Sequence, residues 1–171
     1  MTSTHRRPRN VILAATAIAC SIAGALVATA AGSAQSDGAR TITVFETAKG
    51  STFGFVDNPP KTTRKDPHAS VGDILAFSNA LVDRSRTHRL GSASAQCVAT
   101  RPGRVGGATY VCFGSFALPD GTLAVAALQH GEPKTQQLAI VGGTGAYDGA
   151  RGTILARSLK AGTEDTITLL P

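Results

Sequence analysis

The sequence has few aromatic residues, few charges and no tryptophan, which limits both its core and its partners. Phe, Tyr and Trp together make up 5% of the 171 residues, whereas the hydrophobic residues reach 42% and 19 residues are glycine. A core made from this composition must rely on small aliphatic side chains. The hydrophobic content argues against disorder of the whole chain, and the length argues against a two-domain enzyme.

Charged residues are scarce, and the basic ones are unevenly placed. The net charge of +6 comes from 17 Lys and Arg against 11 Asp and Glu. Arg6, Arg7 and Arg9 all precede the first acid, Asp37, so the rest of the chain carries only +3. This charge density is too low for a nucleic-acid-binding surface, and we expect no nucleic acid among the partners.

The N-terminal segment has the composition of an export signal. A basic stretch at residues 5–9 is followed by an uncharged run over 11–30 and by a small-x-small cleavage pattern at Gly32-Ser33-Ala34. We predict a signal peptide over residues 1–34, a short polar lead-in over 35–40 and one domain over 41–171 in a secreted, extracellular protein. The alternative is a membrane anchor at the cell surface through residues 11–30.

Short alternating segments, divided by turn residues, predict an all-β domain. Residues 41–47 alternate with Ile42, Val44 and Glu46 on one face. Further strands are expected at 74–81, 90–99, 109–118, 122–128, 137–141, 153–158 and 166–170, with a turn at Gly142-Gly143 and a surface loop at 57–70. Because closure pairs every strand edge, a single antiparallel eight-stranded barrel, with little or no helix, is favoured over a sandwich.

Two of the three cysteines remain after processing, and the register of a hairpin places them opposite each other. If the turn is centred between Arg104 and Val105, residues whose numbers sum to 209 face one another, as Cys97 and Cys112 do. Paired cysteines in an exported chain form a disulfide more often than a metal or catalytic site. We therefore predict a disulfide between them.

Motifs for several other chemistries are incomplete. His68, His88 and His130 lie far apart in the sequence without ligand spacing, so we expect no metal site. The glycine string at 142–149 lacks the Lys of a P-loop and the third glycine of a dinucleotide fingerprint. We interpret it as a turn whose glycines supply positive φ, and we expect no cofactor.

The order and spacing of several segments resemble the allene oxide cyclases and dirigent proteins. These segments are Val44-Phe45-Glu46, residues 72–81, Arg89-Leu90-Gly91 with Cys97-Val98, Phe116 with Asp120-Gly121, and residues 138–152. The resemblance spans most of the domain and implies a calycin-like barrel. It also implies an oligomer, either a dimer or a trimer.

The same resemblance suggests where a catalytic site would lie. The cyclases place a Glu, an Asn and a Cys around an unstable epoxide inside the barrel. The matching residues here are Glu46, Asn79 and Cys97, the last only if its thiol is free. A carboxylate in an apolar lumen can stabilise a developing cation, while confinement selects one product. A salt bridge at the barrel rim is the alternative role for Glu46.

Other residues are candidates for binding a substrate. Val44 shares a strand face with Glu46, and Leu75 and Phe77 share a face with Asn79. Dirigent proteins use acidic residues with an Arg near the glycine turn, and Asp148 and Arg151 are the candidates here.

Two classes of function follow. In the first, an exported barrel acts on or guides a small hydrophobic molecule in its lumen, as an isomerase (an intramolecular cyclase) without a cofactor or as a dirigent-like guide of stereochemistry. In the second, a secreted barrel binds ligands or serves a structural role without catalysis. A lumen lined by Glu46 and Asn79 favours the first class, whereas a lumen filled with side chains favours the second.

Overall fold

The computed structural model describes residues 38–171, except residues 64, 66 and 105. The described residues form strands and turns, and they include no helix that could cross a membrane. The predicted signal peptide over 1–34 lies outside the described residues.

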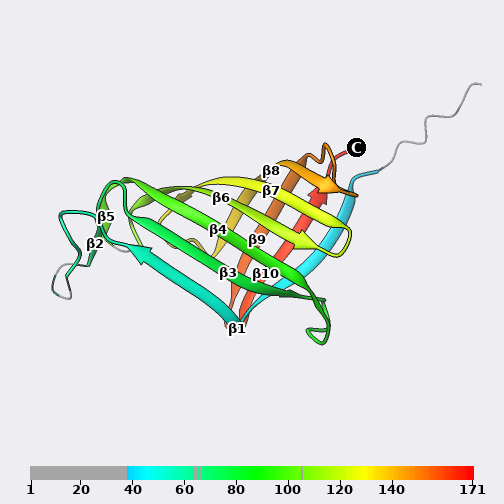
Figure 1. Cartoon of the computed structure of the whole chain (residues 1–171), viewed down its shortest axis with the longest axis horizontal. Coiled ribbons are helices and arrows are strands. Elements are labelled where there is room, and N and C mark those ends of the chain that lie inside the picture. The colour runs from blue at the N-terminus through cyan, green and yellow to red at the C-terminus, as the bar shows by residue number, and fades with distance from the viewer. Residues whose placement is uncertain (1–37, 64, 66, 105) are drawn as a thin grey trace, which may run out of the picture. The chain divides into compact units, whose positions relative to one another are not determined.

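Within the described residues, eight strands close into an antiparallel barrel in the order β1-β10-β9-β8-β7-β6-β4-β3 (Figure 1). They are β1 (Arg40–Val56), β3 (Ile74–Val82), β4 (Arg89–Arg101), β6 (Thr109–Leu118), β7 (Gly121–His130), β8 (Thr135–Gly145), β9 (Gly152–Leu159) and β10 (Gly162–Leu169). Two short strands, β2 (His68–Ala69) and β5 (Gly103–Arg104), form a separate sheet. The predicted all-β barrel is confirmed.

Strand β1 closes the barrel because it pairs with two neighbours. Its residues 40–46 run along β10, and residues 45–47 and 52–56 run along β3. Between Thr47 and Thr52 the register against β3 shifts, and Gly50 has a positive φ of 80°. Figure 1 shows the resulting bend in β1. Glu46 lies before this bend and pairs with both neighbours.

The inward-facing side chains form two apolar clusters. The first is built on fully buried aliphatic side chains from five strands: Val44, Leu81, Leu123, Ile154 and Ile167. Each such side chain contributes about 2 kcal/mol to folding through burial. The second cluster surrounds Cys97 and Cys112 and includes Ala99, Ala108 and Tyr110. The core is mainly aliphatic, as the scarcity of aromatic residues predicted.

The predicted turn at Gly142-Gly143 is wrong, because both residues belong to β8. A Cβ at Gly143 would lie 2.3 Å from the carbonyl oxygen of Tyr147, so close approach of the backbone requires this glycine. The turn follows β8, where Gly145 and Gly149 have φ of 64° and 68°. Positive φ thus explains only part of the glycine string.

Two other predictions also differ from the structure, one for a loop and one for the start of a strand. The predicted surface loop at 57–70 contains β2, which pairs with β5. Strand β10 begins at Gly162 rather than at Thr166 and pairs with β1 along that extension. The earlier start adds Asp165 to the inner face of the barrel.

The register of β4 against β6 confirms the predicted pairing of the cysteines. Cys97 faces Cys112, and the two residues form a disulfide. The thiol of Cys97 is therefore not free to act as a site residue.

Replacing both cysteines with Ala should lower the free energy of unfolding by about 3 kcal/mol, because the bond joins residues 15 positions apart. Urea denaturation of the oxidised protein and the double variant measures this difference. Mass spectrometry should also find the protein two hydrogens lighter than its reduced form. Two thiols that alkylate freely without reduction would contradict the bond.

Candidate functional site

A cavity of about 270 Å³ lies in the barrel lumen. Its apolar lining includes side chains from both apolar clusters. The first cluster contributes Ala93, Phe116, Val125 and Leu138, the second contributes Phe77, and Ala95 completes the lining. Pockets for small molecules begin at about 300 Å³, so this space suits a small ligand. Side chains therefore do not fill the lumen.

One part of the cavity wall is polar. Glu46 on β1, Asn79 on β3 and Asp165 on β10 all line the cavity. On its two neighbouring strands Glu46 directly faces Leu81 and Thr163, and Asn79 and Asp165 each lie two residues further along. Side chains in this diagonal relation share a face of the sheet and come within reach of one another.

Hydrogen bonding joins two of these side chains. The amide nitrogen Nδ2 of Asn79 donates to Oε2 of Glu46. The predicted pair of site residues is therefore brought together at the lumen. This contact orients the Glu46 carboxylate toward β3.

Asp165 is the third member and is completely buried, with 0% of its surface exposed. Its carboxyl oxygens receive no hydrogen bond from a donor group of the described residues. Burial, followed by the nearby charge of Glu46 and a hydrogen bond to that residue, raises the pKa of Asp165 to about 8. Asp165 therefore keeps its proton at neutral pH, beside Glu46 in the wall of the cavity.

Asp165 is not among the predicted site residues, because the strand predicted from the sequence begins at Thr166, one residue after it. The alternation of inward and outward side chains in the last strand does indicate Asp165. Counting back in steps of two from Ile167, an inward residue, leads to Asp165 and Thr163. A longer strand would have placed this acid in the lumen.

The predicted apolar contacts divide between the cavity and the core. Phe77 lines the cavity, as expected. Val44 and Leu75 do not line it; Val44 belongs to the first apolar cluster and Leu75 packs against the second.

Asp148 and Arg151 are not brought to the cavity. Both are exposed and line a separate surface depression beside the C-terminal residues. There, a guanidinium nitrogen of Arg151 donates to the backbone oxygen of Pro171 over 3.3 Å. Elsewhere in the described part of the chain, no three His, Cys, Asp or Glu side chains are grouped to hold a metal ion.

Residues 56–169 match the family model described as the allene oxide cyclase barrel like domain. The chain belongs to this family. The resemblance found in the sequence is thereby confirmed. The matched part of this barrel-like domain includes Asn79 and Asp165, whereas Glu46 lies in the part of β1 that precedes the match.

Several solved structures share the fold of this chain. A pyocyanin demethylase is 19% identical, with a TM-score of 0.62 over 76% of this chain and 99% of its own. The pterocarpan synthase dirigent protein PsPTS1 is 19% identical, with a TM-score of 0.57 over 77% and 93%. The exo-specific intermolecular Diels-Alderase AbnU is 18% identical, with a TM-score of 0.51 over 76% and 98%. Comparison with curated proteins finds no match.

The raised pKa of Asp165 predicts that stability falls as pH rises. The folded state keeps a proton that the unfolded state, with a pKa of 3.8, has released. Between about pH 4 and pH 8 the free energy of unfolding should therefore fall, by at most about 1.4 kcal/mol per pH unit.

Asp165→Asn keeps the shape of the side chain and removes this titration. Its stability should depend less on pH across that range and should exceed that of the wild type above about pH 8. Urea denaturation of both proteins from pH 5 to pH 9 makes the comparison. Parallel stability curves would show that Asp165 does not hold the proton.

Proposed function

We propose that the protein binds a small hydrophobic molecule in its lumen and directs its cyclisation or isomerisation there. Glu46, Asn79 and Asp165 are the polar groups of this site. The observation that carries the proposal is the lumen cavity, which combines apolar walls with one polar region. A lumen filled with side chains would instead have favoured a structural barrel.

The polar region supplies an acid and an anion side by side. Protonated Asp165 can donate to a substrate oxygen, while the Glu46 carboxylate stabilises positive charge that develops on carbon. The Asn79 amide holds that carboxylate in place. The proton that Asp165 lends returns when the product forms, so substrate and product have the same composition and the reaction is an isomerisation.

The apolar walls supply confinement. Phe77, Phe116 and Leu138 approach the cavity from three different strands. A flexible substrate held among them loses torsional freedom before it reacts, which lowers the entropic part of the barrier. The shape of the walls, rather than the charge of Glu46, then selects the stereochemistry of the product.

The solved structures of this fold support the proposal through their names. One is a Diels-Alderase and another is a pterocarpan synthase dirigent protein. Both names refer to reactions of small organic molecules, so barrels of this fold serve small-molecule chemistry. We extend that kind of chemistry to this chain on the strength of its own lumen.

We also propose that the protein is exported. The basic stretch, the uncharged run and the small-x-small pattern before residue 35 support this proposal. The Cys97–Cys112 disulfide supports it independently, because such bonds persist in oxidising compartments. The mass of the secreted protein tests it, since cleavage leaves Gln35 as the first residue and an anchor leaves residues 1–34 attached.

Binding in the lumen is tested with the neutral fluorescent probe N-phenyl-1-naphthylamine. The probe should bind the purified protein, and Ala95→Leu should weaken binding about tenfold because the larger side chain occupies the cavity. Ala76→Leu makes the same change at an exposed position of β3 and should leave binding unchanged. Equal affinities in all three proteins would place the bound probe outside the lumen.

Glu46→Gln separates electrostatic catalysis from confinement, because it removes the charge and keeps the shape. With a substrate identified by capture of metabolites on the purified protein, turnover should fall about 100-fold, while the product ratio and probe binding are retained. Single-turnover kinetics with chiral analysis of the product provides the measurement. An unchanged rate and product ratio would show that Glu46 is a structural residue and takes no part in the reaction.

A further inference from the structure

The second half of β1 is a free strand edge. Residues 52–56 pair with β3 on one side, whereas the pairing of β1 with β10 ends at Glu46. On the other side of residues 52–56, the described part of the chain supplies no backbone partner. Residues 48–56 are all exposed. The N–H and C=O groups that point away from β3 are therefore open to a further strand.

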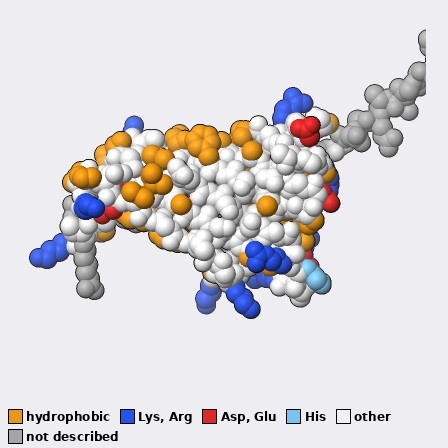
Figure 2. Space-filling model, in the orientation of Figure 1, with side chains coloured by type: hydrophobic (Ala, Val, Ile, Leu, Met, Phe, Trp, Pro, Cys, Tyr) orange, Lys and Arg blue, Asp and Glu red, His pale blue; other side chains and the backbone are white. Residues whose placement is uncertain are grey.

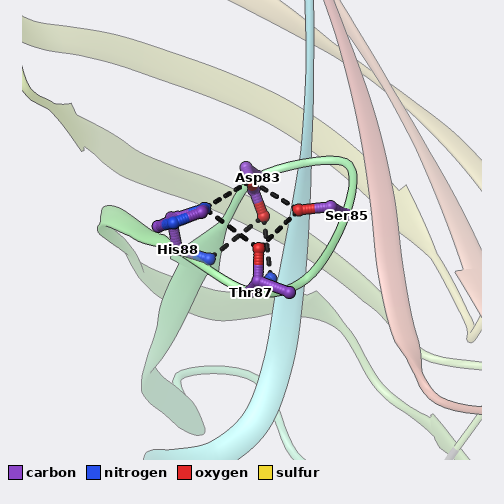
Figure 3. A network of polar contacts seen from close by, with 4 residues as sticks. All are labelled: Asp83, Ser85, Thr87 and His88. Carbon is purple, nitrogen blue, oxygen red and sulfur yellow. Dashed lines mark hydrogen bonds and ion pairs between the residues drawn. The ribbon is translucent and has the colours of Figure 1, made fainter.

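The β3–β4 loop shows how another exposed segment of this chain satisfies its own donors (Figure 3). The Asp83 carboxylate accepts hydrogen bonds from the N–H groups of Thr87 and His88, over 2.9 and 3.2 Å, and from the Ser85 hydroxyl over 2.7 Å. The hydrogen bonds of Ser85 and His88 to this carboxylate hold the pKa of Asp83 below its usual range. Among the described side chains, none bonds in this way to the backbone of residues 52–56.

The side chains of this edge are apolar or uncharged. Phe53 and Phe55 are 70% and 40% exposed, and Val56 is 53% exposed. Residues 50–56 include no charged residue and no proline. Between the bend of β1 and its arrowhead in Figure 1, Figure 2 shows hydrophobic and uncharged side chains. Free edges normally carry charges or prolines that prevent pairing with another chain, and this edge lacks both.

The two phenylalanines continue the inner apolar face of β3. In the register with β3, Phe53 faces Phe77 and Phe55 faces Leu75. Residues that face each other across a pair of strands share one side of the sheet, and Phe77 lines the lumen. The exposure of Phe53 and Phe55 shows that this side is uncovered at the edge. A strand added at the edge would bury both rings.

We propose that residues 52–56 pair in antiparallel fashion with the same residues of a second copy of this chain, about a two-fold axis at Gly54. In this register Phe53 of each copy faces the partner's Phe55, which gives two cross-strand aromatic pairs on one side of the joined sheet. Gly54 faces the partner's Gly54 on the axis. The edge is therefore complementary to itself, as a two-fold interface requires.

The size of this interface predicts a weak dimer. Full burial of a phenylalanine removes about 150–250 Å² of surface. The four rings and the backbone of the two edges then bury about 1,000 Å², which is at the low end of protein–protein interfaces. We therefore expect a dissociation constant of about 10 μM. The assembly stops at two copies, because the pairing uses the β1 edge of both.

Gly54→Cys tests the position of the axis. A Cβ added at Gly54 would meet only the carbonyl oxygen of Ala76, at an ordinary 3.9 Å. At about 100 μM under oxidising conditions, this variant should form a dimer on a non-reducing gel that reduction returns to monomer. Ala76→Cys is the matched control, because Ala76 is exposed and faces Gly54 from β3. Its two copies would lie about 14 Å apart, so this variant should not cross-link.

Two charge variants separate pairing at this edge from association through another surface. Phe53→Lys/Phe55→Lys and Phe53→Glu/Phe55→Glu each place like charges opposite one another across the axis. Sedimentation velocity at about 100 μM should find each variant monomeric and the wild type mostly dimeric. An equal mixture of the two variants should dimerise again, because every Lys then faces a Glu. Phe113→Lys replaces an equally exposed ring on β6 and should leave the dimer intact.

Several results would overturn the proposal. A wild type that stays monomeric at about 100 μM would leave the edge to an extended segment of a different protein. A dimer or trimer that persists in both charge variants, and that Gly54→Cys does not capture, would have its interface on another surface. Cooperative urea unfolding shows that each variant is folded, and folded charge variants that do not dimerise when mixed would also contradict the pairing.

Discussion

Strand β1 must complete two hydrogen-bonded ladders at once, and the lumen exists because it does so. Residues 40–46 pair with β10, while residues 45–47 and 52–56 pair with β3. Without this double pairing, β10 and β3 would each present an open edge, and an open sheet encloses no cavity. Glu46 pairs with both neighbours, and it lines the lumen.

Closure has an electrostatic consequence, because it places the carboxyl groups of Glu46 and Asp165 together in a mainly apolar lumen. Two such groups cannot both ionise at low cost, and the pKa of Asp165 rises to about 8 as a result. An aliphatic side chain at position 165 would contribute about 2 kcal/mol through burial, as the neighbouring Ile167 does. The acid therefore costs stability, which fits a catalytic role better than a structural one.

The lumen cavity combines apolar walls with a polar region formed by Glu46, Asn79 and Asp165. Solved structures with the same fold carry names of different reactions, so the barrel itself does not fix the chemistry. The side chains that line the lumen are therefore what distinguishes the site of this chain.

Local patterns in the sequence determined most of the strands and part of the site. Alternation at 41–47 and 74–81 placed Glu46 and Asn79 on inward faces, because side chains alternate within a single strand. The Cys97–Cys112 bond followed from the register of adjacent strands, which depends on the short segment between them, here a turn and a register shift between Ala99 and Arg101. The glycine string was misread because close backbone approach at Gly143 depends on Tyr147 and on β7, which local patterns do not describe.

Only the tertiary structure decided what surrounds those residues. Asp165 and Glu46 lie near opposite ends of the domain sequence, and they meet because β10 pairs with β1 when the barrel closes. The raised pKa of Asp165 depends on this meeting and on burial. The lumen cavity likewise brings together side chains of β3, β6 and β8. Alternation and turns act over a few residues, whereas proton affinity and pocket shape arise from contacts between distant segments.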